Sequence, residues 1–461
     1  MPPTAPSTLA AADASPAAAP AGRLPLATLL VYAAPGAADG FMFMVVGTYL
    51  LKYGTDVLGI SPGAMGLVLG LSRVWDAVSD PLVGYASDRT RTRLGRRRPW
   101  MVASALPAGA TFILLWAPPQ TLSGVGLVAW MAVSVVCFYT SYTLYVMPHS
   151  ALGAELSPSY VERNRLFGAK RLVAGAGLLL AFGFIAAVSA SDAPRTAATT
   201  GAVVAAVVAI ALLLLPALRL RERPEFQGRG AAHPYGALRD VLRNPHARLL
   251  LLVFLLQQIG VTAAVSVAAY FTQYILGDPT ALPKVLGAFV VSSVLFVPVW
   301  IALGERFEKK PLVVAGMAMV AVALGGLGFL SEGDLLTMAG LCALGGAAGA
   351  GLDVLLPSMQ ADIIDWDELR TGERKEGVYF AVWHFSAKTA AGIAGILVGA
   401  ALQASGFLPN QPQGETTQLA LRALMSGIPL ACYGAGALVF LRFALTRAAH
   451  DEIRRALDRR A

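Results

Sequence analysis

Three ionisable residues, Arg73, Asp76 and Asp80, lie inside an apolar segment that opens near Ser61. On a helix, their spacing of i, i+3 and i+7 places all three side chains on one face. At roughly 1.5 Å per residue, Asp76 lies about 18 Å from Asp88, near the middle of a bilayer. Ionisable groups at that depth are costly unless they face a partner or water, so the pattern predicts an internal polar pathway. The alternative is a structural ion pair between Arg73 and one aspartate, which leaves the second aspartate unexplained.

The composition of the chain is that of a polytopic membrane protein. Of its 461 residues, 56% are hydrophobic and only 14% are charged. The net charge of +8 does not indicate nucleic-acid binding, because the basic residues cluster in short loops between apolar spans. Cys137, Cys342 and Cys432 lie in apolar runs without a CxxC motif or a His at ligand spacing, which argues against a disulfide framework or a zinc site.

About twelve apolar segments are long enough to span a membrane as helices. They cover approximately residues 26–52, 61–87, 99–118, 123–152, 167–190, 199–218, 247–276, 283–304, 311–330, 335–363, 377–404 and 418–446. Every second connection is basic, and the intervening connections contain almost no Lys or Arg. This alternation predicts that both termini lie in the cytoplasm. The membrane expected to hold the chain is the inner (plasma) membrane of the cell.

The two halves of the chain match each other in sequence. Asp88-Arg89 with Arg97-Arg98-Pro99 recurs as Glu305-Arg306 with Lys309-Lys310-Pro311, about 212 residues later. A second echo joins the stretches that begin at Glu162 and Glu373 at nearly the same offset. The fold class predicted is therefore an all-α integral membrane protein with two pseudo-symmetric six-helix bundles, an architecture that carries a solute between its halves.

The spans and the basic connections also define the expected domains. Residues 1–24 are rich in Ala and Pro and lack the basic region and cleavage site of a signal peptide, so they are interpreted as a disordered cytoplasmic tail. The other expected parts are an N-terminal bundle (25–218), a cytoplasmic central loop (219–246), a C-terminal bundle (247–446) and a basic cytoplasmic tail (447–461).

Several separated motifs carry a resemblance to a known family. They are WDAVSDPLVGYASDRTRTRLGRRRPW, the stretch from Tyr53 to Gly59, YTLYVMPHSALGAEL from Tyr142 and MQADIIDWDELRTGERKEG from Met359. In this order the motifs resemble the glycoside-pentoside-hexuronide:cation symporters, the branch of the major facilitator superfamily that includes the melibiose carrier. The resemblance spans nearly the whole chain after residue 25. It implies symport of a glycoside-like solute with a monovalent cation by alternating access of the two halves.

The resemblance also implies roles for particular residues. Asp76 and Asp80 match the paired aspartates that bind the cation, and Thr143 matches a hydroxyl of the same site. Arg171 and Lys388 match the basic residues that approach the sugar and cation sites.

The chain departs from melibiose-type carriers at the solute pocket. Val146 stands where those carriers have a further aspartate, and Ser150 stands where they place a tryptophan that stacks on the sugar. Asp353 stands where the resemblance places an aromatic residue, and Asp39 is another carboxylate at apolar depth. These differences argue against melibiose itself as the solute. Trp383 is the remaining candidate to stack on a sugar face, with core packing as the alternative.

The coupling ion stays open between sodium and a proton. Asp76, Asp80 and Thr143 can supply hard oxygen ligands for a possible sodium ion. A proton needs only a carboxylate beside a like-charged neighbour, which the two aspartates also provide. Arg171 and Lys388 are expected to balance the carboxylates in the absence of the ion, or to bind groups of the substrate.

Other charged residues have less specific interpretations. Asp39 and Asp353 are candidate acceptors for substrate hydroxyls or a second proton site; otherwise they are pore-lining groups solvated by water. A predicted cytoplasmic gate, whose ion pairs must break on inward opening, consists of Asp88, Arg89, Arg93, Arg97 and Arg98. The competing interpretation of the gate is a plain charged loop.

The sequence predicts a symporter that acts as a monomer in lipid on a small-molecule solute and a monovalent cation, without nucleic acid or cofactor. An alternative is a carrier for an amphipathic solute such as a lysophospholipid, because lysolipid carriers resemble the same family. A second is a membrane sensor on the same scaffold that does not transport. An enzyme is not supported, since the sequence has no nucleophile and base at motif spacing.

Overall fold

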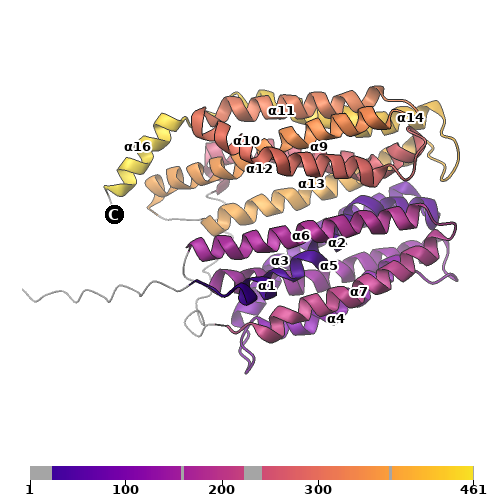
Figure 1. Ribbon diagram of the computed structural model, residues 1–461, viewed down its shortest axis with the longest axis horizontal. Helices are drawn as coiled ribbons and strands as arrows, with labels where there is room; N and C mark the ends of the chain where they lie inside the picture. The colour runs from indigo at the N-terminus through magenta and orange to yellow at the C-terminus, as the bar shows by residue number, and fades with distance from the viewer. Residues whose placement is uncertain (1–22, 157–159, 223–240, 373–375, 460–461) are drawn as a thin grey trace, which may run out of the picture.

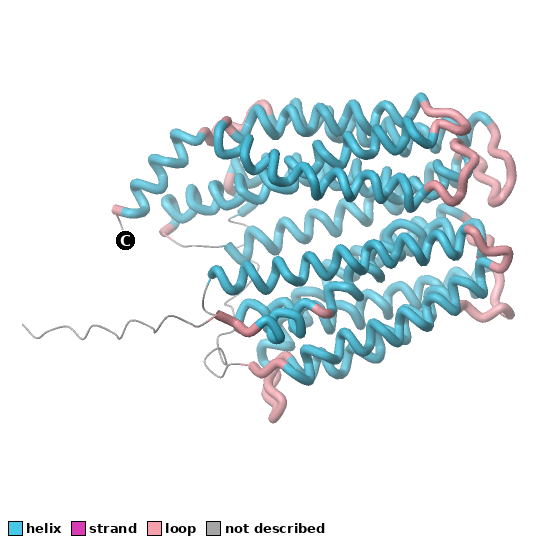
Figure 2. The backbone as a smooth tube through the Cα atoms, viewed as in Figure 1, coloured by secondary structure: helices cyan, strands magenta, loops and turns pink. Residues whose placement is uncertain are grey.

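The computed structural model describes residues 23–156, 160–222, 241–372 and 376–459. Most of the predicted N-terminal tail, most of the central loop and residues 373–375 of the second sequence echo lie outside this range. Figure 2 shows helices joined by loops, and the described residues contain no β-strand. The predicted all-helical fold is confirmed.

The first half of the chain forms one bundle of long helices. Its α-helices are α1 (Leu26–Ala33), α2 (Pro35–Lys52), α3 (Pro62–Arg89), α4 (Arg98–Trp116), α5 (Gly124–Glu155), α6 (Tyr160–Ser189) and α7 (Pro194–Arg219). A short π-helical segment, η1 (Tyr53–Val57), follows α2 directly. Within the bundle α2 packs on α6, α4 packs on α5 and α7, and α3 packs on α5.

The second half forms a second bundle beside the first (Figure 1). Its α-helices are α9 (Pro245–Tyr274), α10 (Leu282–Arg306), α11 (Lys309–Gly326), α12 (Leu335–Thr371), α13 (Glu376–Ala404), α14 (Glu415–Arg422), α15 (Ile428–Phe440) and α16 (Arg447–Asp458). Short segments η3 (Leu327–Phe329) and η4 (Ala423–Gly427) follow α11 and α14. Helix α12 packs on α10 and α11, and α9 packs on α13 and α15.

Eleven described helical segments are long and apolar enough to cross a membrane. Helix α3, with 28 residues, is also long enough, but its charged residues lower its hydropathy. With α3 included, the described helices reach the predicted number of about twelve. Several helices extend beyond the predicted apolar segments, because a helix can continue into water after its apolar stretch ends. Helix α12, for example, runs to Thr371 rather than ending near residue 363.

The ends of the helices follow local sequence signals. Pro62, Pro194 and Pro245 open α3, α7 and α9 at positions where a missing backbone N–H costs nothing. The side chain of Asn244 caps α9 by accepting hydrogen bonds from the next backbone N–H groups. Gly372, with a φ of 72°, ends α12 in the left-handed conformation that glycine adopts at little cost.

The molecule has two ends that we name by their contents. The basic end carries Arg96 to Arg98, and α1 and α16 lie there (Figure 1). The distal end carries η1 and the loop around Asn410, which contact each other. Between the ends, α3 of the first bundle packs along α13 of the second. This cross-bundle pair positions the polar groups of α3 against those of α13.

Candidate coupling and solute site

The two aspartates in the middle of α3 meet a lysine from the other bundle. The ammonium of Lys388 on α13 donates a hydrogen bond to Asp80 Oδ2, and its Nζ lies 3.5 Å from Asp76 Oδ2. Arg73, which also lies on α3, approaches Asp76 Oδ2 to 3.6 Å. The hydroxyl of Thr143 on α5 donates a hydrogen bond to Asp80 Oδ1 at 2.9 Å. The structure therefore brings together five of the residues that the sequence singled out. We name Asp76, Asp80, Thr143 and Lys388 the coupling cluster.

The coupling cluster has a buried side and an accessible side. Asp76 is only 2% exposed, whereas the side chain of Lys388 is 27% exposed. The Oδ1 atom of Asp76 is buried and has no hydrogen-bond partner in the described structure. A buried carboxylate oxygen without a donor is unfavourable. This atom is therefore a candidate ligand for a cation that enters from the side of Lys388.

Asp39 takes part in a separate polar network inside the first bundle. It accepts a hydrogen bond from the hydroxyl of Tyr142, and Lys170 Nζ lies 2.9 Å from its Oδ2. Lys170 Nζ also lies 3.5 Å from His149 Nδ1, while His149 Nε2 contacts the backbone carbonyl of Tyr32 at 3.1 Å. Because an ammonium only donates, His149 Nδ1 accepts and its Nε2 donates. The sequence did not single out Lys170 as the partner of Asp39.

Arg171 and Asp353 lie on opposite bundles and are both exposed. In the described part of the chain neither side chain makes a hydrogen bond or an ion pair. By contrast, the charged residues of the coupling cluster and Asp39 all form such contacts.

Trp383 and His384 lie one turn before Lys388 on α13. The ring of Trp383 stacks on Phe254 of α9, with ring centroids 3.8 Å apart and planes 23° apart. One face of the predicted sugar platform is therefore used for packing between helices, which is the alternative considered for this residue. His384 is exposed.

At the basic end, only some of the predicted gate residues form ion pairs. Arg97 lies 3.1 Å from Asp88 Oδ1 and 2.7 Å from Glu155 Oε1. Arg96, which the sequence did not single out, lies 2.5 Å from the same Glu155 oxygen. These pairs join α3, α5 and the loop before α4. All of these elements belong to the first bundle.

The other predicted gate residues have different surroundings. Arg98 donates to the backbone carbonyl of Ala217, near the end of α7. The guanidinium of Arg89 lies over the ring of Tyr85 at 3.9 Å, and Arg93 is exposed. The carboxylate of Glu222 accepts hydrogen bonds from three successive backbone N–H groups of the arginine run, at 2.8 to 2.9 Å. No sequence motif indicated this partner, which lies more than a hundred residues away.

The distal end carries a cluster of polar contacts that the sequence did not predict. Lys52 and Asp56, one turn apart at the junction of α2 and η1, form an ion pair whose side chains are only 6% and 5% exposed. The hydroxyl of Tyr274 on α9 donates to Asp56 Oδ2 at 2.7 Å, and the side-chain amide of Asn410 donates to the Asp56 carbonyl at 2.8 Å. The hydroxyl of Thr55 contacts that of Tyr270 on α9 at 2.8 Å. These contacts join the two bundles; together we name them the distal seal.

Next to the distal seal, glycines bring α3 and α13 into backbone contact. A Cβ atom at Gly66 would collide with the backbone of Gly395 and Gly399, and one at Gly399 would collide with the carbonyl of Pro62. Small residues permit this close helix packing inside a membrane. The distal half of the interface between the bundles is therefore closed.

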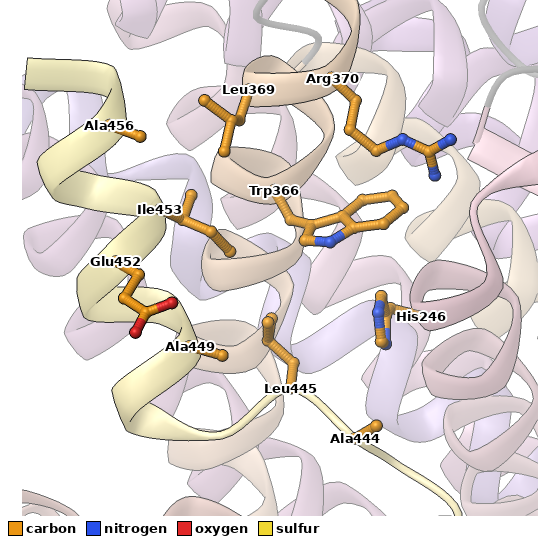
Figure 3. Close-up of a pocket in the computed structure, with 10 residues that line it drawn as sticks. All are labelled: His246, Trp366, Leu369, Arg370, Ala444, Leu445, Ala449, Glu452, Ile453 and Ala456. Atoms are coloured by element: carbon orange, nitrogen blue, oxygen red, sulfur yellow. The ribbon is translucent and has the colours of Figure 1, made fainter. Parts of the chain in front are cut away.

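A cavity of about 510 Å³ lies at the basic end, outside the coupling cluster. Figure 3 shows Ile453 of α16 on one side of it and the ring of Trp366 of α12 on the other. His246 meets this ring edge-on at 5.1 Å, and the guanidinium of Arg370 lies 4.6 Å from it. None of the described residues that line this cavity belongs to the predicted site.

Comparison with known proteins identifies the class. The family model described as MFS/sugar transport protein matches residues 31–447, most of the chain. The chain therefore belongs to this family, whose members are membrane transporters. The resemblance found in the motifs is confirmed.

Particular relatives agree with this placement. The isoprimeverose transporter of Lactiplantibacillus pentosus is 26% identical, over 93% of this chain and 92% of the relative. The sodium-dependent lysophosphatidylcholine symporter 1 of Gallus gallus is also 26% identical, over 95% of this chain and 90% of the relative. The crystal structure of a D-xylose-proton symporter matches with a TM-score of 0.66 at 15% identity, covering 91% of this chain and 98% of that one. This last likeness shows the major facilitator fold.

Proposed function

We propose that this chain is a secondary active transporter that carries a sugar or glycoside-like solute together with a monovalent cation by alternating access. The observation that carries the proposal is the contact of Lys388 with Asp80 and Asp76. An ammonium from one bundle takes the place where a cation would bind the carboxylates of the other bundle. The family of the chain and the isoprimeverose transporter among its relatives support a sugar as the solute.

The geometry suggests how ion and solute binding are coupled. A cation that binds Asp80 competes with the ammonium of Lys388 for the same carboxylate. Displacement of Lys388 breaks a direct link between the bundles and frees the ammonium to donate hydrogen bonds to solute oxygens. A ligand shifts a conformational equilibrium only by binding one state better than another. Here the cation favours states in which Lys388 no longer holds α13 to α3.

Both sodium and a proton fit the coupling cluster. Asp76 Oδ1, Asp80 and the hydroxyl of Thr143 are hard oxygen donors of the kind that sodium prefers. A proton needs one of the carboxylates alone. The sodium-dependent relative in Gallus gallus supports sodium, and the likeness to a proton symporter concerns the fold alone. The experiment below distinguishes sodium from a proton, because it imposes a gradient of one ion or the other and measures which gradient drives accumulation.

We further propose that the basic end faces the cytoplasm of the cell whose plasma membrane holds the chain, where it acts as a monomer without a catalytic activity. The positive-inside rule supports this orientation, because Arg and Lys of short loops gather at the basic end. In this orientation the distal seal closes the route to the outside.

The test is uptake into proteoliposomes under an imposed sodium or proton gradient, with a panel of sugars, glycosides and lysophosphatidylcholine. One gradient should drive accumulation of a sugar or glycoside. Asp76→Asn and Asp80→Asn should each abolish accumulation while the protein still inserts, and Asp451→Asn on the exposed side of α16 should retain it. Normal uphill uptake by both coupling variants would refute the assignment. If lysophosphatidylcholine were the only compound taken up, the assigned solute would be a lysolipid instead of a sugar. If no ligand that binds showed counterflow, the chain would be a sensor that does not transport.

A further inference from the structure

The cavity beside the C-terminal helix α16 has no part in the proposed transport mechanism. It has a volume of about 510 Å³ and lies between α16, the first turn of α9 and the last turns of α12 (Figure 3). Its wall on α16 consists of residues on one face of the helix, namely Ala449, Glu452, Ile453 and Ala456. The two alanines are small, so the space between the helices stays open. We name this space the α16 cavity.

Polar contacts that do not line the cavity hold α16 in place. His450 Nε2 and Arg454 Nη1 lie 3.1 Å and 3.4 Å from Asp365 Oδ2 on α12. Arg447 Nη1 donates a hydrogen bond to the backbone carbonyl of Glu305 at 3.0 Å. Because several contacts attach α16 to its own bundle, the cavity is part of the folded bundle.

The position of Trp366 places the cavity at the edge of the membrane. The apolar stretch of α12 gives way to acidic residues from Asp362 onward, and Trp366 follows one turn later. Tryptophan is enriched where a membrane-spanning helix meets the headgroup region. Helix α16 has charged residues on one side and apolar residues on the other, as do helices that lie in the membrane interface. The cavity therefore lies at the depth of the lipid headgroups.

The cavity combines apolar walls with a guanidinium that lacks an acidic partner. Its large apolar lining residues are Trp366, Leu369, Leu445 and Ile453. The guanidinium of Arg370 lies 4.6 Å from the centre of the Trp366 ring and makes no hydrogen bond or ion pair in the described part of the chain. The carboxylate of Glu452 lies apart from it, on α16 (Figure 3). A guanidinium binds phosphate oxygens through paired hydrogen bonds, so a phosphate that carries a hydrocarbon chain matches both features.

We propose that the α16 cavity binds an anionic phospholipid of the membrane leaflet at the basic end, with the phosphate on Arg370 and an acyl chain against Trp366 and Ile453. A soluble phosphate would leave the apolar walls in contact with water. In a zwitterionic lipid, the ammonium group close to the phosphate would offset the attraction of the phosphate to Arg370. The inference goes beyond the proposed function, because it concerns neither the solute nor the coupling ion.

The first test measures the role of Arg370 in lipid binding. Binding of phosphatidylglycerol and phosphatidylcholine with the same acyl chains to the purified, delipidated full chain is measured by native mass spectrometry. The wild type should bind phosphatidylglycerol at least about fivefold more tightly, the contribution of one arginine to the binding of anionic lipid. Arg370→Gln should reduce this ratio to less than about twofold. Arg91→Gln, at an exposed arginine in the loop before α4, makes the same change in net charge and should keep the ratio.

The second test measures the role of the apolar walls. Ala449→Trp places an indole in the cavity and should weaken phosphatidylglycerol binding at least about tenfold, the effect of about two methylene groups left unburied. Ala448→Trp, at a neighbouring exposed position outside the cavity, should leave the affinity unaltered. If Ala449→Trp does not purify as a folded protein, Ala456→Trp replaces it.

The measurements also separate the lipid from other occupants. Glycerophosphoglycerol, which is the headgroup without acyl chains, should not displace phosphatidylglycerol at equal concentration. Displacement would make the cavity a site for soluble phosphates, and a protein dimer in place of a lipid adduct would make it an interface between copies of the chain; either result would overturn the inference. Equal binding of the two lipids by the wild type, equal effects of Arg370→Gln and Arg91→Gln, or unaltered affinity in the cavity variant would also overturn it.

Discussion

The two ends of the molecule use polar contacts in different ways. At the distal end, Asp56 is bonded to Tyr274 and Asn410 of the other bundle. At the basic end, the carboxylate of Glu155 binds Arg96 and Arg97 within its own bundle. Contacts between bundles must break when the distal end opens, whereas contacts within a bundle can move with it as a rigid body. The distal seal should therefore set the conformational equilibrium, and the basic pairs should set the stability of a bundle.

A similar difference holds for the second bundle. Near its basic end, Lys309 Nζ lies 2.6 Å from Asp362, and His450 and Arg454 of α16 approach Asp365 at 3.1 Å and 3.4 Å. These pairs attach α16 and α11 to α12 of the same bundle. Ion pairs within each bundle thus stabilise the two bundles separately at the basic end.

The largest effect is expected from Asp56→Asn. The substitution leaves the ammonium of Lys52 buried without its counter-charge, which costs roughly 3–5 kcal/mol in the distally closed state. Spin labels at Asp192 and Glu332, in loops of different bundles at the distal end, should report a new population at longer distance. The double variant Lys52→Met and Asp56→Leu removes both charges and should restore much of the closed population. An unaltered distance distribution in Asp56→Asn would contradict the assigned role of the seal.

The next effect is expected from Gly66→Leu. Its side chain would meet the backbone of Gly395 and Gly399, which cannot move aside without separating α3 from α13. Overpacking of this kind costs roughly 1–3 kcal/mol and should slow solute counterflow in proteoliposomes. Gly84→Leu on the same helix is the matched control, because a Cβ there meets open space. Equal counterflow in the two variants would show that the glycine contact does not matter.

A smaller and different effect is expected from Glu155→Gln at the basic end. The substitution weakens charged hydrogen bonds with Arg96 and Arg97, worth about 1.5 kcal/mol. The melting temperature of the purified protein should fall, while the distance between labels at Asp192 and Glu332 should stay the same. If that distance distribution changed as it does in Asp56→Asn, the two ends would not differ in the way described.

The smallest effect concerns Glu162 at the beginning of α6. Hydrogen bonds from the Arg165 side chain and the Leu24 backbone N–H lower the pKa of Glu162 below its ordinary value of about 4.3. A lowered pKa in the folded state means that this stabilisation is present above the ordinary value and is lost as the pH falls through the folded pKa. Glu162→Gln should therefore flatten the fall in melting temperature between pH 5 and pH 3, roughly the window of this titration. Parallel curves for the two proteins would contradict this contribution.

Much of the fold could be predicted from the sequence because its signals are local. Apolar segments, basic loops and the echo between Asp88-Arg89 and Glu305-Arg306 all lie within short stretches. Asp76 and Asp80 could likewise be placed on one face, since helical spacing alone determines this. The motifs around them also indicated the family, which the comparisons confirm.

The partners of these residues could not be predicted in the same way. Lys170 beside Asp39, Glu222 below the arginine run and Tyr274 against Asp56 are each more than a hundred residues from the group they contact. Helical periodicity gives the face of a side chain but not the neighbouring helix or its depth. Only the packing of the two bundles determines which charges meet.

The sequence by itself thus determined the helices, their two-bundle arrangement and the carboxylates of the second span, because each depends on residues close together in the chain. The tertiary structure alone decided that Lys388 meets Asp80, that Lys170 meets Asp39, and that the seal lies at the distal end. The physical reason is that an ion pair between helices requires a particular rotation, depth and separation of both. These quantities follow from side-chain packing over the whole interface and not from any single motif.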